Sequence, residues 1–175
     1  MTGTSRRYPI GKFQRPAAIA PADRARWIET IAAAPARMRE AAAALTELEL
    51  DTPYREGGWT ARQVIHHVPE SHMNAYIRFK LALTETDPVI KPYDEAAWAR
   101  LNDVAVTPIE ASLALLEALH RRWVVLMQGM PEADWKRGYI HPEAQDHAVI
   151  PLEEVLALYA WHSDHHLGHV KSMIA

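Results

Sequence analysis

The sequence has 175 residues, with ten histidines, no cysteine and a formal net charge of −3 when the histidines are neutral. Its hydrophobic share of 49% and charged share of 23% are typical of a globular domain. No basic stripe indicates a nucleic-acid partner, and no apolar run approaches the roughly 20 residues of a membrane span. No signal-peptide pattern is recognised. We expect one cytoplasmic domain over residues 1–175, in which a soft metal ion would be bound through nitrogen.

The sequence of residues 1–48 predicts an extended arm followed by a helical region. Residues 1–20 contain prolines and show little periodicity, so they are expected to lie as an arm on the domain. A helical region should run from Ala22 to Leu48. Pro35 lies inside it and lacks a backbone donor, which predicts a kink or two consecutive helices.

A second helix is predicted after the turn-forming residues 51–58. Thr60 and Gln63 form a capping box, which marks its first turn. The helix should continue to about Thr84. Pro69 interrupts it, frees one carbonyl of the preceding turn and should bend the helix near its two adjacent histidines.

A long connection over residues 87–106 separates this helix from the next, with room for a short helix at Glu95–Leu101. Thr107 as N-cap and Glu110 three residues later predict the start of a third long helix. A face of leucines spaced three and four residues apart supports this helix, which should end near Gly129.

The last part predicts a loose hairpin over Gly138–Ile150 and a helix from Pro151 almost to Ala175. Acidic residues in the first turn of this helix and a lysine in the last suit its macrodipole. Four long helices with one long connection in the middle predict an all-α, four-helix bundle with a crossover between the second and third helices.

The last helix carries a histidine pair with the spacing of metal ligands. His162 and His166 are four residues apart, so their rings stack on one face and can chelate one ion. His169 continues the same stripe, whereas His165 should point about a quarter-turn away. A histidine stripe can also be a solvated helix face, and the spacing alone does not exclude this.

A catalytic metal ion usually takes three protein ligands, so a third is expected from a facing helix. His66 and His67 lie about 100° apart around the helix after Thr60, and only one of them can face the core. Periodicity favours His67, although Pro69 leaves the choice open. His72 belongs to the same group of histidines. The reserve candidates are His120, His141 and, more weakly, His147.

Few of the residues near the histidines have a predicted role in binding or catalysis. Glu70, one turn from His67, could orient that imidazole, but glutamates on helices are more often exposed. Asp164 is expected at the surface, and Tyr159 at the pocket or in the core. The sequence identifies no proton carrier. Three tryptophans are expected to pack rather than bind substrate: Trp59, Trp123 and Trp161.

Longer stretches resemble a known family. They are Tyr-Pro-Ile-Gly at 8–11, the segment 50–60, Val-Ile-His-His-Val at 64–68, the segment 71–85, Arg-Gly-Tyr-Ile-His-Pro at 137–142, and Tyr-Ala-Trp-His-Ser-Asp-His-His at 159–166. In this order they resemble the DinB-like superfamily, and within it the YfiT-like branch of metal-dependent hydrolases. The superfamily also includes bacillithiol S-transferases.

The resemblance implies a four-helix up-and-down bundle with an unusual crossover, a homodimer, and the metal ligands His67, His162 and His166. Pro69 departs from the usual pattern, which affects the local helix geometry rather than the ligands. The implied activity is hydrolysis of a small molecule by a water activated on one divalent ion per subunit, with zinc favoured and nickel as the alternative.

Two other functions fit the same histidines. A metal-dependent S-transferase would use the open metal position to bind a low-molecular-weight thiol as its thiolate, for example in detoxification. A non-catalytic, metal-stabilised bundle that binds a ligand needs the same ion but no reacting group. The sequence does not distinguish hydrolysis from thiol transfer.

Overall fold

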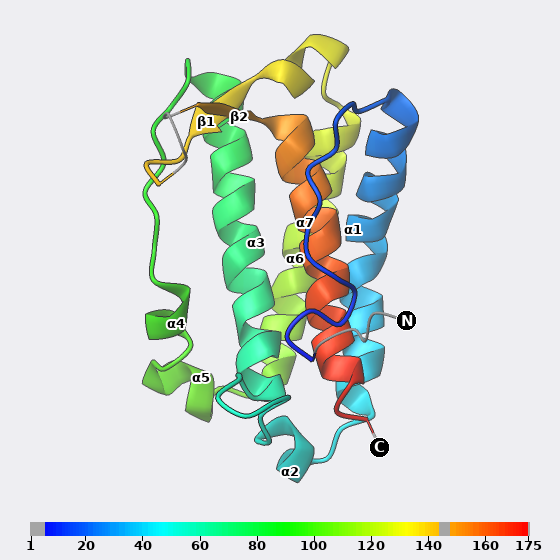
Figure 1. The fold of residues 1–175 in the computed structure, drawn as a ribbon, viewed down its shortest axis with the longest axis vertical. Helices are drawn as coiled ribbons and strands as arrows, with labels where there is room; N and C mark the ends of the chain where they lie inside the picture. Colours follow the sequence, from blue (N-terminus) through cyan, green and yellow to red (C-terminus); the bar gives the residue numbers. More distant parts are fainter. Residues whose placement is uncertain (1–5, 144–147, 175) are drawn as a thin grey trace.

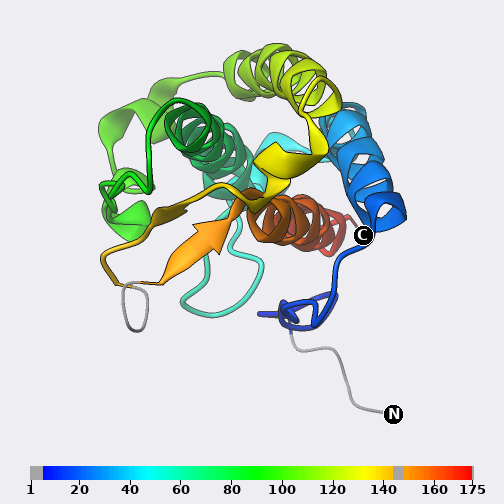
Figure 2. The ribbon, with the colours of Figure 1, turned by 90° about the horizontal axis from the view of Figure 1, so that it is seen from above.

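The computed structural model describes residues 6–143 and 148–174. Four long helices lie side by side and form a bundle: α1 (Pro21–Ala43), α3 (Ala61–Thr84), α6 (Ile109–Gln128) and α7 (Leu152–Lys171) (Figure 1). The expected all-α bundle is therefore confirmed. The view along the bundle shows the four helices arranged around a common centre (Figure 2).

The crossover determines the direction of the helices. α3 and α6 run the same way along the bundle, because the connection between them returns the chain to the end where α3 began (Figure 1). This connection contains two short helices, α4 (Glu95–Trp98) and α5 (Asn102–Val106), where one short helix was expected.

The first helix differs from its prediction in two ways. α1 is a single helix that includes Pro35, so it does not divide into two. It ends at Ala43, and a new short helix, α2 (Glu47–Leu50), follows. The prediction of one region to Leu48 is wrong because Thr46 and Glu49 form a capping box, in which the Thr46 amide donates to the Glu49 carboxylate at 2.7 Å.

The second long helix begins as predicted. The Gln63 amide donates to Thr60 Oγ1 at 3.1 Å, and the Thr60 amide donates to Gln63 Oε1 at 2.9 Å. The helix ends at Thr84, as expected. Local capping chemistry was sufficient to place this element.

The predicted N-cap of the third long helix is wrong by one residue. The Thr107 amide donates to the Asp103 carbonyl at 2.9 Å, so Thr107 closes α5 instead of opening α6. Pro108 is the N-cap of α6. The reason is that α5 extends to Val106 and uses the Thr107 donor for its own last turn.

A short hairpin and the N-terminal arm complete the fold. The 3₁₀ helix η1 (Glu132–Lys136) leads into β1 (Gly138–Ile140), which pairs antiparallel with β2 (Val149–Pro151). The predicted hairpin is thus confirmed, although its candidate His147 lies outside the described residues. The described part of the arm, residues 6–20, runs beside α7 (Figure 1).

Two apolar clusters fill the bundle, and histidines lie between them. One cluster contains Phe79, Trp123 and Leu156, and the other contains Val64, Leu116 and Leu167. Along α3, α6 and α7, buried histidines occupy the positions between the residues of the two clusters. The bundle therefore has a polar layer across its core. None of the described helices is long and apolar enough to cross a membrane.

Candidate metal centre

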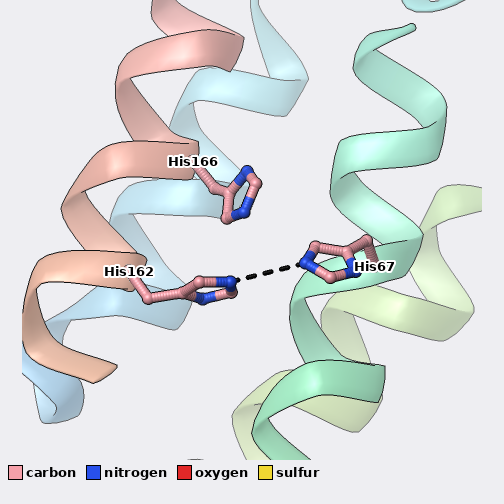
Figure 3. Close-up of side chains that lie close together, drawn as sticks. All are labelled: His67, His162 and His166. Carbon is pink, nitrogen blue, oxygen red and sulfur yellow. Dashed lines mark hydrogen bonds between the residues drawn. The ribbon is translucent and has the colours of Figure 1, made fainter. Parts of the chain in front are cut away.

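Three histidines from two helices converge at this layer (Figure 3). His67 comes from α3, and His162 and His166 come from successive turns of α7. Each offers one ring nitrogen, and these nitrogens all lie within 4.8 Å of one another. The structure thus brings together the three histidines predicted as ligands. His66 lies elsewhere, with its Nδ1 2.7 Å from Ser112 Oγ.

The spacing of the nitrogens fits a metal ion. Nε2 of His67 and Nε2 of His162 are 3.4 Å apart. Two imidazole nitrogens bound to one zinc ion at tetrahedral angles would lie about 3.3 Å apart, given Zn–N distances of about 2.05 Å. A set of three nitrogen donors suits zinc and nickel better than magnesium or calcium.

Burial keeps the three rings neutral. It lowers the pKa of His67 to about 4. The pKa values of His162 and His166 lie well below the ordinary histidine value, because of burial first and neighbouring histidines second. Neutral rings present lone pairs, so protons compete weakly with a metal ion at neutral pH.

The other predicted candidates do not join this set. His120 lies behind it, with its Nε2 2.8 Å from Nδ1 of His72. His141 lines the cavity but is absent from the convergent group. His165 packs flat on Trp161, with 4.4 Å between the ring centroids. His165, His166 and His169 form a second convergent group, which shares His166 with the first.

The polar neighbours differ in part from expectation. Among the described residues, Glu70 makes no hydrogen bond to His67, and burial raises the pKa of its carboxyl group. Asp164 is about one-third exposed and pairs with Arg37 at 2.6 Å. Tyr159 lines the cavity and donates to the Ser71 carbonyl at 3.4 Å. The alternative in which Glu70 orients His67 is therefore not seen.

The three tryptophans pack as expected, and each has its ring beside a histidine. Trp123 is fully buried. Trp59 lies with its ring centroid 4.8 Å from that of His67, in an edge-on arrangement. Trp161 donates from Nε1 to the Gly11 carbonyl at 3.3 Å and so connects α7 to the N-terminal arm.

The three histidines line a cavity of about 800 Å³, within the usual size range of small-molecule sites. His162 is partly exposed there, while His67 and His166 are buried. Sequence reasoning missed Arg78 and Glu95 in the lining. Glu95 lies within the long connection after α3, and no local pattern indicates that this connection returns to the histidines.

The sequence also gave no role to His72. Its Nε2 lies 3.0 Å from Nδ1 of His162, on the side of that ring away from His67. His72 is fully buried and contacts both α6 and α7 through its two ring nitrogens. It therefore touches a predicted ligand without belonging to the convergent group.

Comparison with known proteins places this arrangement in a family. The model of the DinB superfamily matches residues 22–170. The "Putative metal-dependent hydrolase YfiT" of Bacillus subtilis is 45% identical over 173 residues, which are 99% of this chain and 96% of that protein. A protein of the same description from Oceanobacillus iheyensis is 48% identical over 167 residues, 95% of each chain.

A solved structure agrees with both the fold and the family. It is that of YfiT from Bacillus subtilis, called a "probable metal-dependent hydrolase with an unusual four-helix bundle topology". It matches with a TM-score of 0.91 and 45% identity, over 96% of this chain and 95% of that chain. The present chain belongs to the DinB superfamily.

Proposed function

We propose that this protein is a metal-dependent hydrolase that acts on a small molecule, with one divalent ion held by His67, His162 and His166. The observation that carries the proposal is the convergence of three neutral imidazoles at the wall of a cavity of about 800 Å³. Zinc is the proposed ion, and nickel is the alternative.

The residues of the chain supply the geometry of such a site. Two ligands on successive turns of α7 and one on α3 come from packed helices, so their rings are fixed relative to one another. Three ligands leave one position of a tetrahedral ion open. When bound, the ion supplies Lewis-acid chemistry and lowers the pKa of a water to about 7.

We propose Glu95 as the proton carrier. Hydrolysis requires a group that accepts a proton and passes it to the leaving group. Two glutamates are among the described residues that line the cavity, and Glu154 pairs with Arg15 at 2.7 Å. Glu95 has no such ion pair among the described residues, and partial desolvation raises the pKa of its carboxyl group above the ordinary glutamate value, with Arg78 opposing the rise.

The metal content of purified protein tests the proposed ligands. We expect about one zinc or nickel ion per chain in the wild type, and none in the double variant His67→Ala, His162→Ala. His66→Ala is the matched control, because it removes the adjacent histidine that contacts Ser112. Metal retained by the double variant, measured by mass spectrometry, would show that the ligands are wrong.

An activity assay tests the reaction. Metal-loaded protein is incubated with a panel of small esters and amides, and we expect hydrolysis that His162→Ala abolishes and Glu95→Gln reduces, with a changed pH profile. Parallel incubations contain an electrophile and small thiols. Conjugation above the uncatalysed rate without hydrolysis would instead establish thiol transfer. If neither hydrolysis nor conjugation is observed, the non-catalytic bundle is favoured.

Three further expectations stay predictions: a single domain over residues 1–175, a homodimer and a cytoplasmic location. A single cooperative unfolding transition and the mass in solution would test the first two.

A further inference from the structure

We infer that two networks of buried histidines, each ending on a backbone carbonyl, hold His162 and His166 with Nδ1 protonated and Nε2 directed at the metal position. The core network is His162, His72, His120 and the Ile31 carbonyl. The arm network is His166, His169 and the Arg7 carbonyl. The inference rests on the proposed metal site, but the networks can be tested without metal.

The core network has only one consistent assignment of protons. A carbonyl oxygen can only accept, so His120 Nδ1 donates to Ile31, at 2.7 Å. A neutral imidazole carries one N–H, and His120 Nε2 must therefore accept from His72 Nδ1, at 2.8 Å.

The same reasoning continues from His72 to the metal position. His72 Nε2 must accept from His162 Nδ1, at 3.0 Å. The remaining lone pair of His162 lies on Nε2, the atom 3.4 Å from Nε2 of His67. The tautomer of His120, in α6, thus determines which nitrogen of His162 can bind the ion.

Pro35 explains why the Ile31 carbonyl is available. In an α-helix this carbonyl would accept from the backbone N–H four residues later. Residue 35 is proline and has no N–H, yet it lies inside the continuous helix α1. The ring of His120 replaces the missing donor. A helix interruption that is visible in the sequence therefore supplies the acceptor on which the core network ends.

The arm network gives the same result from a different acceptor. His169 Nε2 donates to the Arg7 carbonyl at 3.3 Å, so its Nδ1 is free to accept. His166 Nδ1 lies 3.4 Å from that atom and donates to it, which leaves the His166 lone pair on Nε2. The ring of His169 also stacks on Tyr54, with 4.0 Å between the centroids. His169 is therefore a positioning residue and not a fourth ligand.

Burial makes both networks effective. His72, His120 and His169 are at most 2% exposed, so water does not compete for their ring nitrogens. Metal-binding histidines usually donate their other ring N–H to a fixed acceptor, which orients the ring. Here the acceptors are themselves histidines. A ring turned the other way would leave buried nitrogens without partners, at a cost in free energy.

The tautomers can be measured directly in the full chain. In metal-free protein labelled with ¹⁵N-histidine, two-bond ¹H–¹⁵N spectra distinguish Nδ1–H from Nε2–H. We expect Nδ1–H for His162, His166, His72 and His120, and Nε2–H for His169 alone among these five. Nε2–H on His162 or His166 would overturn the inference. Because no metal is present, this result does not depend on the proposed function.

Zinc affinity tests whether the networks act on the metal site. Competition with a chromogenic chelator should show binding about 10- to 100-fold weaker in His72→Phe and in His169→Phe. The matched control is His66→Phe, a buried histidine of α3 outside both networks, which should bind zinc as the wild type does. His72→Gln keeps an acceptor for His162 and should recover most of the affinity.

Urea unfolding of each metal-free variant separates positioning from folding. Folded His72→Phe and His169→Phe with wild-type zinc affinity would overturn the inference. If His72→Phe does not fold, His72→Gln and the tautomer spectra still decide it. A wild-type protein that binds no zinc would contradict the proposed function, while the tautomer pattern would still test the networks.

Discussion

The two histidine networks perform the same task with different structural support. In the core network the successive distances are 3.0, 2.8 and 2.7 Å, and they connect α7, α3, α6 and α1. In the arm network they are 3.4 and 3.3 Å, and they connect α7 to the N-terminal arm. Shorter bonds within packed helices should restrain a ring more strongly than longer bonds to an arm.

The difference indicates that His162 is held more firmly than His166. The core network lies in the layer between the two apolar clusters, where every helix of the bundle contributes. The arm is attached through individual side-chain contacts, such as the bond from Trp161 Nε1 to the Gly11 carbonyl and the ion pair of Arg15 with Glu154. The comparison predicts different sensitivities of the site to changes in the two regions.

The largest expected effect comes from removing both networks. If they act independently, the free energies add, and the double variant His72→Phe, His169→Phe should bind zinc about 10²- to 10⁴-fold more weakly than the wild type. His72→Phe, in the core network, should lose more zinc affinity than His169→Phe, in the arm network. Chelator competition on all three variants measures this, and an equal or larger loss in His169→Phe would reverse the comparison.

The next largest effect is expected in the pH dependence of stability, which should differ between the core network and the arm network. Burial lowers the pKa of His120 to about 4, against about 6.5 in the unfolded chain. Below pH 6.5 the unfolded state takes up this proton while the folded state does not, so stability falls as the pH falls. The shifted pKa of His120 alone should lower the free energy of unfolding by about 3 kcal/mol between pH 7 and pH 4.

Urea unfolding of metal-free protein across this range measures the effect. His120→Phe should flatten the dependence of the unfolding free energy on pH. His169→Phe should flatten it less, because hydrogen bonds to two arm carbonyls, those of Arg7 and Arg6, oppose the lowering of its pKa. Among the described residues, only the Ile31 carbonyl opposes the lowering of the pKa of His120. A wild-type slope in His120→Phe would contradict the assigned pKa.

The two helix-interior prolines should respond differently to replacement by alanine. A proline inside a helix typically costs about 3 kcal/mol relative to alanine. The Ile31 carbonyl freed by Pro35 accepts from His120, whereas no side chain among the described residues donates to the Ile65 carbonyl freed by Pro69. Pro69→Ala should therefore stabilise metal-free protein more than Pro35→Ala. Urea unfolding measures both, and equal gains would show that the His120 bond contributes nothing.

The smallest effect is expected at the attachment of the arm. Trp161→Phe keeps an aromatic ring beside His165 but removes the donor to the Gly11 carbonyl. We expect a loss of about 1 kcal/mol in stability and less than about a threefold change in zinc affinity. A larger loss of affinity would mean that the arm holds His166 as firmly as the core holds His162.

The sequence predicted the elements whose signals are local. The capping box at Thr60, the histidine spacing in α7 and the antiparallel hairpin all follow from neighbouring residues. The sequence predicts the N-cap of α6 at Thr107, one residue before its place in the structure, and it predicts no separate helix α2. In the first case two adjacent helices compete for the same backbone donor, and in the second a capping box lies just beyond the end of a helix.

The amino-acid pattern is sufficient to predict the four helices and a histidine pair able to share one ion, because helical periodicity is a property of consecutive residues. The resemblance to a family then indicated His67 as the third of the set. Only the tertiary structure placed His72, His120 and the Ile31 carbonyl in one network, and Arg7 beside His169. The physical reason is that these bonds join residues on different elements, and their positions depend on how the helices and the arm pack together.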